Sequence, residues 1–453
     1  MSELRTALTA AGIRPVTEPD IIAAHSVDHA RLVPPGRAAA LVRARSTAEV
    51  QAVLGVASEL RVPVVPQGAR TGLAGAATAV DGAILLDVSG MDRIHSLDPV
   101  DRTAVCGPGV VNADLSRAAA EHGLRFAPDP GSWESSTVGG NIATAAGGMC
   151  CVKYGVTAEY VLGLEVVLAS GEVMRCGRRT AKGVAGYDLT RLFCGSEGTL
   201  GVITEATVKL SPVPAGRLTL AAVFDTTAAA GRAVAAIMAA GAQPSLLELL
   251  DDVHLRALED LRPMGMPTDA AALLLVAADA DPEAELVQIE RLCAEAGAAE
   301  VYRATDAAEA DALLESRRQA LPAMERLGTV LVDDVAVPRS RLAEALDRIR
   351  AAADRHGVLI GVVAHAGDGN LHPNIVVDAG DEASLAAGRA AFDEILAAAL
   401  ELGGTVTGEH GVGMLKREWL EQEVDPVNLA VQRRLKEALD PLGILNPGKV
   451  LAG

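Results

Sequence analysis

The residues best suited to chemistry are two histidines that flank a glycine-rich turn. His365 ends the apolar run that begins at Val358, and His372 lies at the start of the next apolar stretch. A hairpin with its turn at residues 367–369 would bring the two imidazoles side by side. With Glu409, in a second glycine-bounded loop, they would form a set that suits zinc, manganese or iron and leaves positions for substrate. Histidines with a structural role near a turn are the alternative, which the spacing alone leaves open.

Further polar residues accompany this set. His410 is the candidate general base, because it cannot readily share a metal with its neighbour Glu409 and because an imidazole titrates near neutral pH. A supporting hydrogen bond is its alternative role. Asn374 could fix a substrate carboxylate or a metal ligand. Arg317 and Arg318 offer planar guanidinium groups that match a carboxylate, although most arginine pairs on helices are solvated.

Three glycine-rich loops indicate a long nucleotide cofactor. In the first, residues 66–75, glycines permit the positive φ angles that turn successive N–H groups toward one anion. It fits neither the Walker A pattern nor GxGxxG, and a simple glycine-rich turn is the alternative. In the second, residues 129–148, small residues would let a flat ligand lie against the backbone beside Ser, Thr and Asn. The third, residues 195–203, puts two glycines before an apolar strand.

The elements that must position these residues follow an α+β pattern. Strand-like and helical segments alternate from Ala38, and Ser46 or Thr47 is expected to cap a helix that ends near Leu60. Beyond Pro214, strands alternate with long Ala-rich helices, which predicts an antiparallel sheet under helices that forms a substrate domain. The predicted divisions are an N-terminal helical segment, a cofactor domain, a substrate domain with the metal site, and a helical segment that returns to the cofactor domain: 1–33, 34–214, 215–415 and 416–453.

Composition narrows the possible functions. The 453 residues carry 40 Lys and Arg against 59 Asp and Glu, a formal charge of −19, and only 2% are aromatic. Such a chain is poorly suited to bind nucleic acid, which requires cations and stacking rings. No apolar run approaches the roughly 20 residues of a transmembrane helix, and no signal peptide is recognised, so a cytoplasmic protein is expected. The six cysteines contain no CxxC pair, so electrons would have to leave through another molecule.

Six motifs in order resemble one known family. PQGARTGLAGAA, GGNIATAAGG, AGYDLTRLFCGSEGTLGVIT, HAGDGNLHPNI, TGEHGVG and NPGKVL are similar to the FAD-linked oxidases of the vanillyl-alcohol oxidase/p-cresol methylhydroxylase fold, in the D-2-hydroxyacid dehydrogenase branch. The resemblance covers about residues 30–453 and implies a two-subdomain FAD-binding domain plus an antiparallel-sheet cap domain. It also implies that His365, His372 and Glu409 bind a metal, most simply zinc, and that Arg317 binds the substrate carboxylate.

The resemblance further implies a set of FAD contacts. The first loop would hold the diphosphate, and the next two loops and the C-terminal segment would surround the ribityl chain and the flavin ring. The implied contacts are Gly68, Ala69, Arg70, Thr71, Gly72, Leu73, Asp129, Pro130, Gly131, Ser132, Thr137, Gly140, Asn141, Thr144, Gly147, Gly148, Ile203 and Asn446.

The predicted function is oxidation of a small D-2-hydroxy acid, such as D-lactate or glycolate, to the 2-oxo acid. The metal would assist, His410 would take a proton, and hydride would pass to FAD. The acceptor that reoxidises FAD is left open among a quinone, an electron-transfer flavoprotein, a partner subunit and oxygen, and a homodimer is also left open. Leu321 and Val332 stand where relatives that oxidise D-2-hydroxyglutarate carry polar residues, which favours the smaller substrates. The alternatives are a D-2-hydroxyglutarate dehydrogenase, an aldonolactone- or sugar-oxidising flavoenzyme, and a non-catalytic subunit.

Overall fold

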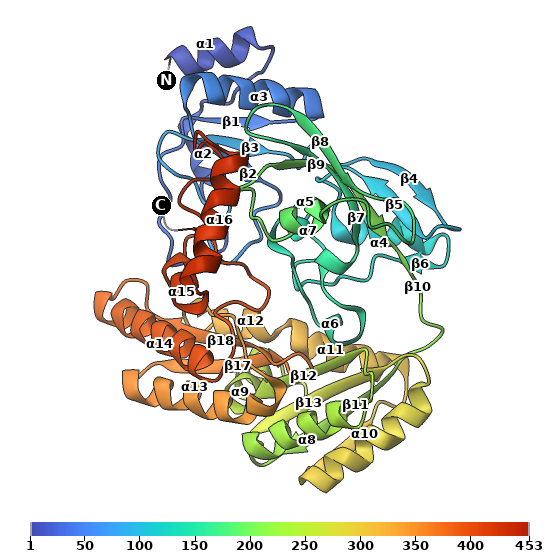
Figure 1. Cartoon of the computed structure of the whole chain (residues 1–453). Helices are drawn as coiled ribbons and strands as arrows, with labels where there is room; N and C mark the ends of the chain where they lie inside the picture. Colours follow the sequence, from blue (N-terminus) through green and yellow to red (C-terminus); the bar gives the residue numbers. More distant parts are fainter. Residues whose placement is uncertain (1, 452–453) are drawn as a thin grey trace. The chain divides into compact units, whose positions relative to one another are not determined.

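The computed structural model describes residues 2–451 and divides the chain into two compact units (Figure 1). Unit 1 consists of Met1–Gly147, Val156–Val213 and Glu409–Gly453, and unit 2 consists of Gly148–Gly155 and Pro214–Gly408. The chain therefore enters unit 2 twice, first in a short excursion and then in one long segment.

Unit 1 contains a parallel sheet of order β1-β3-β2, an antiparallel sheet of order β4-β5-β9-β7-β8, and the small pair β10-β6. Its strands are β1 Ala40–Arg43, β2 Val64–Gln67, β3 Ile84–Asp87, β4 Ile94–Asp98, β5 Thr103–Cys106, β6 Leu124–Arg125, β7 Val161–Val167, β8 Val173–Gly177, β9 Val202–Lys209 and β10 Ser211–Pro212. Its helices are α1 Ser2–Ala10, α2 Pro19–His25, α3 Thr47–Leu60, α4 Asn112–Ala120, α5 Val138–Thr144, η1 Thr157–Glu159, α7 Leu189–Phe193, α15 Arg417–Glu423 and α16 Pro426–Leu439.

Helix α3 shows how local sequence builds unit 1. The side chain of Ser46 accepts a hydrogen bond from the backbone N–H of Glu49, which confirms the predicted cap. Val50, Val53 and Leu54 are fully buried in one apolar cluster that also contains residues of β1 and β3. All four residues of β3 are buried, as expected for the central strand of a covered parallel sheet.

Unit 2 is built on an eight-stranded antiparallel sheet of order β14-β11-β13-β12-β17-β18-β15, with β16 also paired to β18. Its strands are β11 Leu218–Phe224, β12 Leu246–Asp251, β13 Ala272–Ala278, β14 Glu300–Arg303, β15 Thr329–Val332, β16 Val335–Ala336, β17 Leu359–His365 and β18 Asn370–Val377. Its helices are α6 Cys151–Tyr154, α8 Thr227–Ala239, α9 Asp252–Leu261, α10 Pro282–Ala296, α11 Ala307–Arg318, α12 Ala320–Glu325, η2 Arg339–Arg341, α13 Leu342–His356 and α14 Glu382–Glu401.

Helices cover both faces of this sheet. One apolar cluster joins Leu258 of α9, Leu314 of α11 and Met324 of α12 to Leu250 and Val363 of the strands. Helices α10, α8, α13 and α14 each contact the next one and strands of the same sheet, and they follow each other along it (Figure 1). The predicted α+β class with an antiparallel sheet under helices is therefore confirmed.

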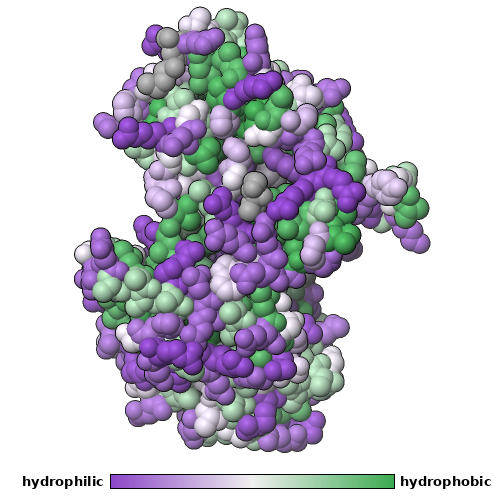
Figure 2. Space-filling model, turned by 60° about the vertical axis from the view of Figure 1, so that its left-hand side comes forward, coloured by the Kyte–Doolittle hydropathy of each residue, from purple (hydrophilic) through white to green (hydrophobic). Residues whose placement is uncertain are grey.

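No helix among residues 2–451 combines the length and the apolar character that crossing a bilayer requires. Hydrophilic residues cover much of the face drawn in Figure 2, and hydrophobic residues gather in patches between them.

Two glycines in helices should respond oppositely to substitution by alanine. Gly55 of α3 is exposed, and an added Cβ would meet nothing within 4 Å. Gly388 of α14 is buried, and its added Cβ would lie 2.4 Å from a methyl carbon of Val377. We expect Gly55→Ala to stabilise by about 1 kcal/mol through helix propensity. Overpacking should make Gly388→Ala destabilise by about 1–3 kcal/mol. Thermal unfolding midpoints check both, and a rise for Gly388→Ala would contradict the packing of α14.

Candidate functional site

The strand register of unit 2 gathers polar side chains on one face of its sheet. Glu248 of β12 lies opposite His365 of β17, which lies opposite Asn370 of β18. Directly opposed residues share a face, and so do residues two apart on one strand. His372 and Asn374 therefore lie on the same face as this first row. The predicted hairpin of β17 and β18 is confirmed, and it places both histidines as expected.

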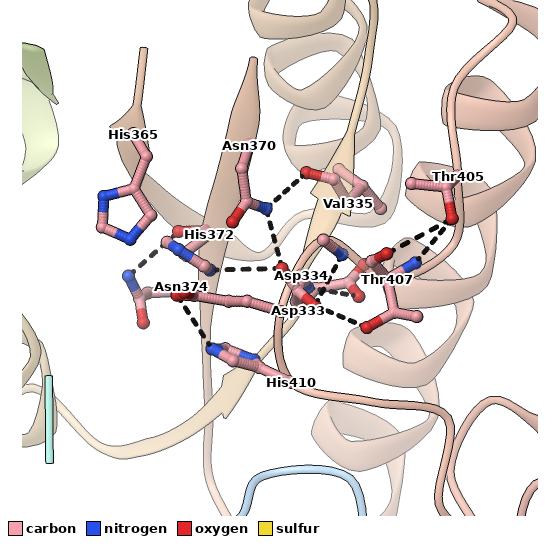
Figure 3. Close-up of polar contacts among 12 residues, drawn as sticks. Asp333, Asp334, Val335, His365, Asn370, His372, Asn374, Thr405, Thr407 and His410 are labelled. Atoms are coloured by element: carbon pink, nitrogen blue, oxygen red, sulfur yellow. Dashed lines mark hydrogen bonds and ion pairs between the residues drawn. The ribbon is translucent and has the colours of Figure 1, made fainter. Parts of the chain in front are cut away.

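The two histidines lie close together and are largely shielded from solvent. Their ring centroids are 5.0 Å apart in an edge-to-face arrangement. One nitrogen of the His365 ring lies within 4.8 Å of a nitrogen of the His372 ring (Figure 3). His365 and His372 are only 6% and 5% exposed. Two imidazoles at this separation fit the nitrogen ligands of a divalent transition metal.

A buried carboxylate approaches the second histidine. Oδ1 of Asp334 lies 3.6 Å from Nδ1 of His372, and Oδ2 accepts hydrogen bonds from the hydroxyl of Thr407 at 2.7 Å and the backbone N–H of Gly408 at 2.9 Å (Figure 3). The Asp334 side chain is fully buried. Glu409 directly follows Gly408 in the chain. The bond from Gly408 to Asp334 therefore anchors the backbone that leads into Glu409 beside His372.

The first histidine and Arg317 share one carboxylate. Oε1 of Glu248 lies 2.7 Å from Nδ1 of His365, and Oε2 accepts a 2.6 Å bond from Nε of Arg317. Burial alone would raise the pKa of Glu248, but the charges and hydrogen bonds of His365 and Arg317 hold it below its ordinary value. Since an ionised carboxylate only accepts hydrogen bonds, Nδ1 of His365 is the donor, and Nε2 is the nitrogen that carries the lone pair when the ring is neutral.

A second carboxylate on β12 supports Asn374. Oδ1 of Asp251 lies 3.1 Å from Nδ1 of His254, whose Nε2 lies 3.2 Å from the amide nitrogen of Asn374. The same amide nitrogen donates to the backbone carbonyl of His372. These bonds fix the orientation of the Asn374 side chain. His254 itself lies against Gly361, where an added Cβ would come within 2.7 Å of the imidazole.

Glu409 and His410 belong to unit 1 and directly follow Gly408, the last residue of unit 2. Oε2 of Glu409 lies 2.3 Å from where a Cβ on Gly147 would stand, so a side chain at that position of the second glycine-rich loop would displace the Glu409 carboxylate. Nε2 of His410 is 3.8 Å from Oε1 of Glu409. The structure thus groups His365, His372, Asn374 and, through Glu248, Arg317 within unit 2.

Within unit 1 the glycine-rich loops meet around helix α5. A Cβ on Gly68 of the first loop would lie 2.4 Å from Oγ1 of Thr137, the residue that caps α5. In the third loop, Gly195 and Glu197 donate backbone hydrogen bonds to the carbonyls of Ile142 and Ala143. The three loops therefore form one region, as the sequence predicted for a cofactor held by loops.

Several polar atoms in this region suit a polar ligand. Within residues 2–451, Oε1 of Gln67, Oγ of Ser136 and Nδ2 of Asn141 are buried without a hydrogen-bond partner. Such atoms carry an energetic cost unless something bonds to them. The predicted contacts of residues 68–73 are half-buried, Gly131 is exposed, and Ile203 is buried in β9. The Gln67, Ser136 and Asn141 atoms offer both donors and acceptors, which fits the phosphates, ribose and ring of FAD.

The C-terminal segment reaches the same loops. Nδ2 of Asn446 donates to the carbonyls of Ala76 and Glu197, and Nζ of Lys449 donates to the carbonyl of Thr78. The carboxylate of Glu197 accepts the backbone N–H groups of residues 412 and 413. Burial raises the pKa of Glu197 to about 7, although these bonds and the charge of Lys449 lower it. Burial lowers the pKa of Lys449 to about 8.

Sequence reasoning missed the carboxylates that hold the site. Glu248 stands in the apolar strand LLELLD, and Asp334 stands between two short strands in VLVDDVAVP. The available signal was a lone acid in an otherwise apolar run, because a buried carboxylate needs nearby donors. The identity of those donors, far away in the sequence, was not visible.

Replacing Glu197 should change how stability depends on pH. Its pKa in the folded protein, about 7, exceeds the ordinary 4.5, so the folded state holds more protons than the unfolded chain between these values. The free energy of unfolding should therefore fall as the pH rises through this window. We expect a shallower fall for Glu197→Gln, measured by urea unfolding at both ends of the window. Glu172→Gln, on an exposed turn, is the control, and an unchanged slope in Glu197→Gln would contradict the prediction.

Comparison with known proteins identifies two families along the chain. Residues 38–177 match the "FAD binding domain" family, and residues 213–450 match "FAD linked oxidases, C-terminal domain". The chain is 44% identical over 417 residues to glycolate oxidase subunit GlcD of Bacillus subtilis, covering 91% of this chain and 89% of that protein. It is 37% identical over 424 residues to a D-lactate dehydrogenase of Anaerostipes hadrus, covering 90% and 89%.

A solved structure shows the same fold. The crystal structure of p-cresol methylhydroxylase with substrate bound matches with a TM-score of 0.81 and 16% identity, covering 99% of this chain and 95% of that one. The extent of the family match, together with the relatives, confirms the resemblance that the six motifs carry. The chain belongs to the FAD-linked oxidases and is an FAD-dependent oxidoreductase with the p-cresol methylhydroxylase fold.

Proposed function

We propose that this flavoenzyme oxidises a small D-2-hydroxy acid, such as D-lactate or glycolate, to the 2-oxo acid with the help of a divalent metal. The observation that carries the proposal is the shared carboxylate of Glu248, which gathers a guanidinium and an imidazole on one face of a sheet. A 2-hydroxy acid presents a carboxylate beside a hydroxyl. The carboxylate matches the guanidinium of Arg317, and the hydroxyl matches the neighbouring metal ligands with their ion. Relatives named as glycolate oxidase subunit and D-lactate dehydrogenase support this substrate class.

The proposed metal ligands are His365, His372 and Glu409. The two imidazoles lie within reach of one ion, and Nε2 of His365 carries a lone pair. The bond from Gly408 to Asp334, beside His372, supports the inclusion of Glu409, the next residue. Zinc is the favoured ion, with manganese or iron as alternatives. A metal there would supply positive charge that acidifies a hydroxyl and attracts a carboxylate.

Arg317 is proposed to bind the substrate carboxylate. Its Nε donates a hydrogen bond to Glu248, and in the described part of the chain this is the only hydrogen bond of the guanidinium. The two terminal nitrogens are thus available for a bidentate contact. Asn374, whose amide nitrogen is held by His254 and by the backbone of His372, can present its amide oxygen to the substrate or to a metal ligand.

His410 is proposed as the general base. A neutral imidazole can take the proton of the substrate hydroxyl as the C2 hydrogen leaves. FAD, when bound, supplies the acceptor for that hydride. The proposed FAD contacts are those named from the sequence, from Gly68 to Leu73, through the second and third loops, to Ile203 and Asn446.

The chain's own residues favour a small substrate. Leu321 of α12 and Val332 of β15 pack against the apolar cluster on the site's face of the sheet, and Val332 is paired with Asn374. A second carboxylate beside these side chains would lack a partner, and a buried unpaired charge costs several kcal/mol. D-2-hydroxyglutarate and aldonolactones or sugars are the alternative substrates.

The electron acceptor is proposed to lie outside this chain. The cysteine pattern offers no iron–sulfur motif, so the reduced flavin would pass its electrons to a quinone, an electron-transfer flavoprotein or a partner subunit. A relative named as a glycolate oxidase subunit supports the last of these. A cytoplasmic location is part of the proposal.

The substrate assignment can be tested by reducing the flavin anaerobically. We expect D-lactate or glycolate to bleach the flavin absorbance, and kcat/KM for D-lactate to exceed that for D-2-hydroxyglutarate. The L-enantiomer of lactate is the control. A kcat/KM that favours the diacid by about tenfold or more would show that the pocket holds a second carboxylate.

The metal assignment predicts a contrast between two histidine variants. His372→Ala should lose bound metal and most activity but keep FAD, because the loops of unit 1 remain intact. His410→Ala should keep the metal while turnover falls about 100-fold or more, as expected for a lost general base. Metal analysis, flavin absorbance and turnover distinguish them.

His356→Ala is the matched control, because His356 is paired with Glu394 on the surface of α13 and α14. Metal retained in His372→Ala would remove this residue from the ligand set. Normal turnover in His410→Ala would reassign the base.

A further inference from the structure

Glu248 is an unusual residue for its place in the fold. It lies in the middle of β12 between two buried leucines, and its side chain has no exposed area. Removing a carboxylate from water is costly unless strong donors compensate. Each of its two oxygens has one such donor: Nδ1 of His365 at 2.7 Å and Nε of Arg317 at 2.6 Å.

The bond to His365 sets the chemistry of that ring. Because the carboxylate can only accept, it holds the proton on Nδ1 and leaves the lone pair on Nε2. It also fixes the ring plane, since β12 and β17 pair directly at these two residues. A carboxylate behind a histidine ligand raises the basicity of the ring and so strengthens its bond to a metal.

The bond to Arg317 sets the position of the guanidinium. Arg317 lies in the last turn of α11, and its side chain is 12% exposed. A long side chain at a helix end has several rotamers, and fixing Nε aligns the plane of the fork. The same carboxylate offsets part of the arginine's charge, which limits its repulsion of a nearby metal cation.

We propose that Glu248 is a positioning residue that couples two parts of substrate binding: it orients His365 for the metal and Arg317 for the substrate carboxylate. The inference rests on the proposed function and names the residue that sets its geometry. One carboxylate with two acceptors allows both groups to be held at a fixed separation. Loss of the carboxylate should therefore disturb both binding events, although Glu248 touches neither ligand.

The test uses the FAD-bound full chain with Glu248→Gln. Glutamine keeps the shape but carries no charge and replaces one accepting oxygen by an NH2 donor, so it opposes one of the two donors and weakens the bond to the other. After metal removal, zinc is titrated back against a chromophoric chelator. We expect zinc to bind about 10–100-fold more weakly. With zinc saturating, KM for D-lactate should rise about tenfold or more, whereas the flavin spectrum stays unchanged.

Three further variants sharpen the result. Glu283→Gln, which removes an exposed acid paired with Arg303, is the matched control and should bind zinc and D-lactate as the parent does. Glu248→Asp keeps the charge and both acceptors and should recover part of each loss. If Glu248→Gln loses FAD, the zinc affinity and the KM of Glu248→Asp, compared with those of the parent, test the positioning role instead. Arg317→Lys should raise KM less in the Glu248→Gln background than in the parent, because the two residues act together.

The outcomes separate the inference from the proposed function. If the parent binds zinc and Glu248→Gln binds zinc and D-lactate equally well, the positioning role is overturned and the proposed function stands. If only one of the two binding events changes, the coupling is overturned. If the parent binds no metal and turns over no 2-hydroxy acid, the proposed function fails, and the inference fails with it.

Discussion

The register of β12, β17 and β18 is the constraint on which the site of unit 2 depends. A slip of one residue would turn every side chain of a strand to the other face of the sheet. The apolar residues of these strands prevent such a slip, because Leu250 and Val363 pack on one face with α9, α11 and α12. The same packing that buries the leucines therefore keeps Glu248, His365 and His372 together.

Buried carboxylates complete what the register begins. Asp334 in unit 2 accepts the N–H of Gly408, and Glu197 in unit 1 accepts the N–H groups of Val412 and Gly413. The segment that contains Glu409 and His410 is therefore anchored on both sides by hydrogen bonds from its backbone to buried carboxyl groups. A loop of small residues would otherwise have many conformations, and its two functional side chains would lack a defined position.

Much of this arrangement could be predicted because it is local or repeated along the chain. The cap at Ser46, the hairpin that carries His365 and His372, and the α+β class with helices on an antiparallel sheet were all predicted and are confirmed. The spacing of hydrophobic residues and the residue types in turns act over a few positions, so they can be interpreted without knowledge of the fold. The supporting residues could not be predicted in this way. Glu248 is 117 residues from His365 and 69 from Arg317, and nothing near it in sequence indicates either partner.

By itself, the sequence determined the family, the glycine-rich loops and the residue types that could bind a metal, a carboxylate and a proton, because these depend on composition and on short motifs. The tertiary structure decided which of those residues share a face, which nitrogen of His365 keeps its lone pair, and which acids hold Arg317, Asn374 and the backbone before Glu409. The physical reason is that hydrogen-bond geometry depends on the pairing of distant strands. That pairing is set by the burial of apolar residues throughout unit 2 and not by any motif.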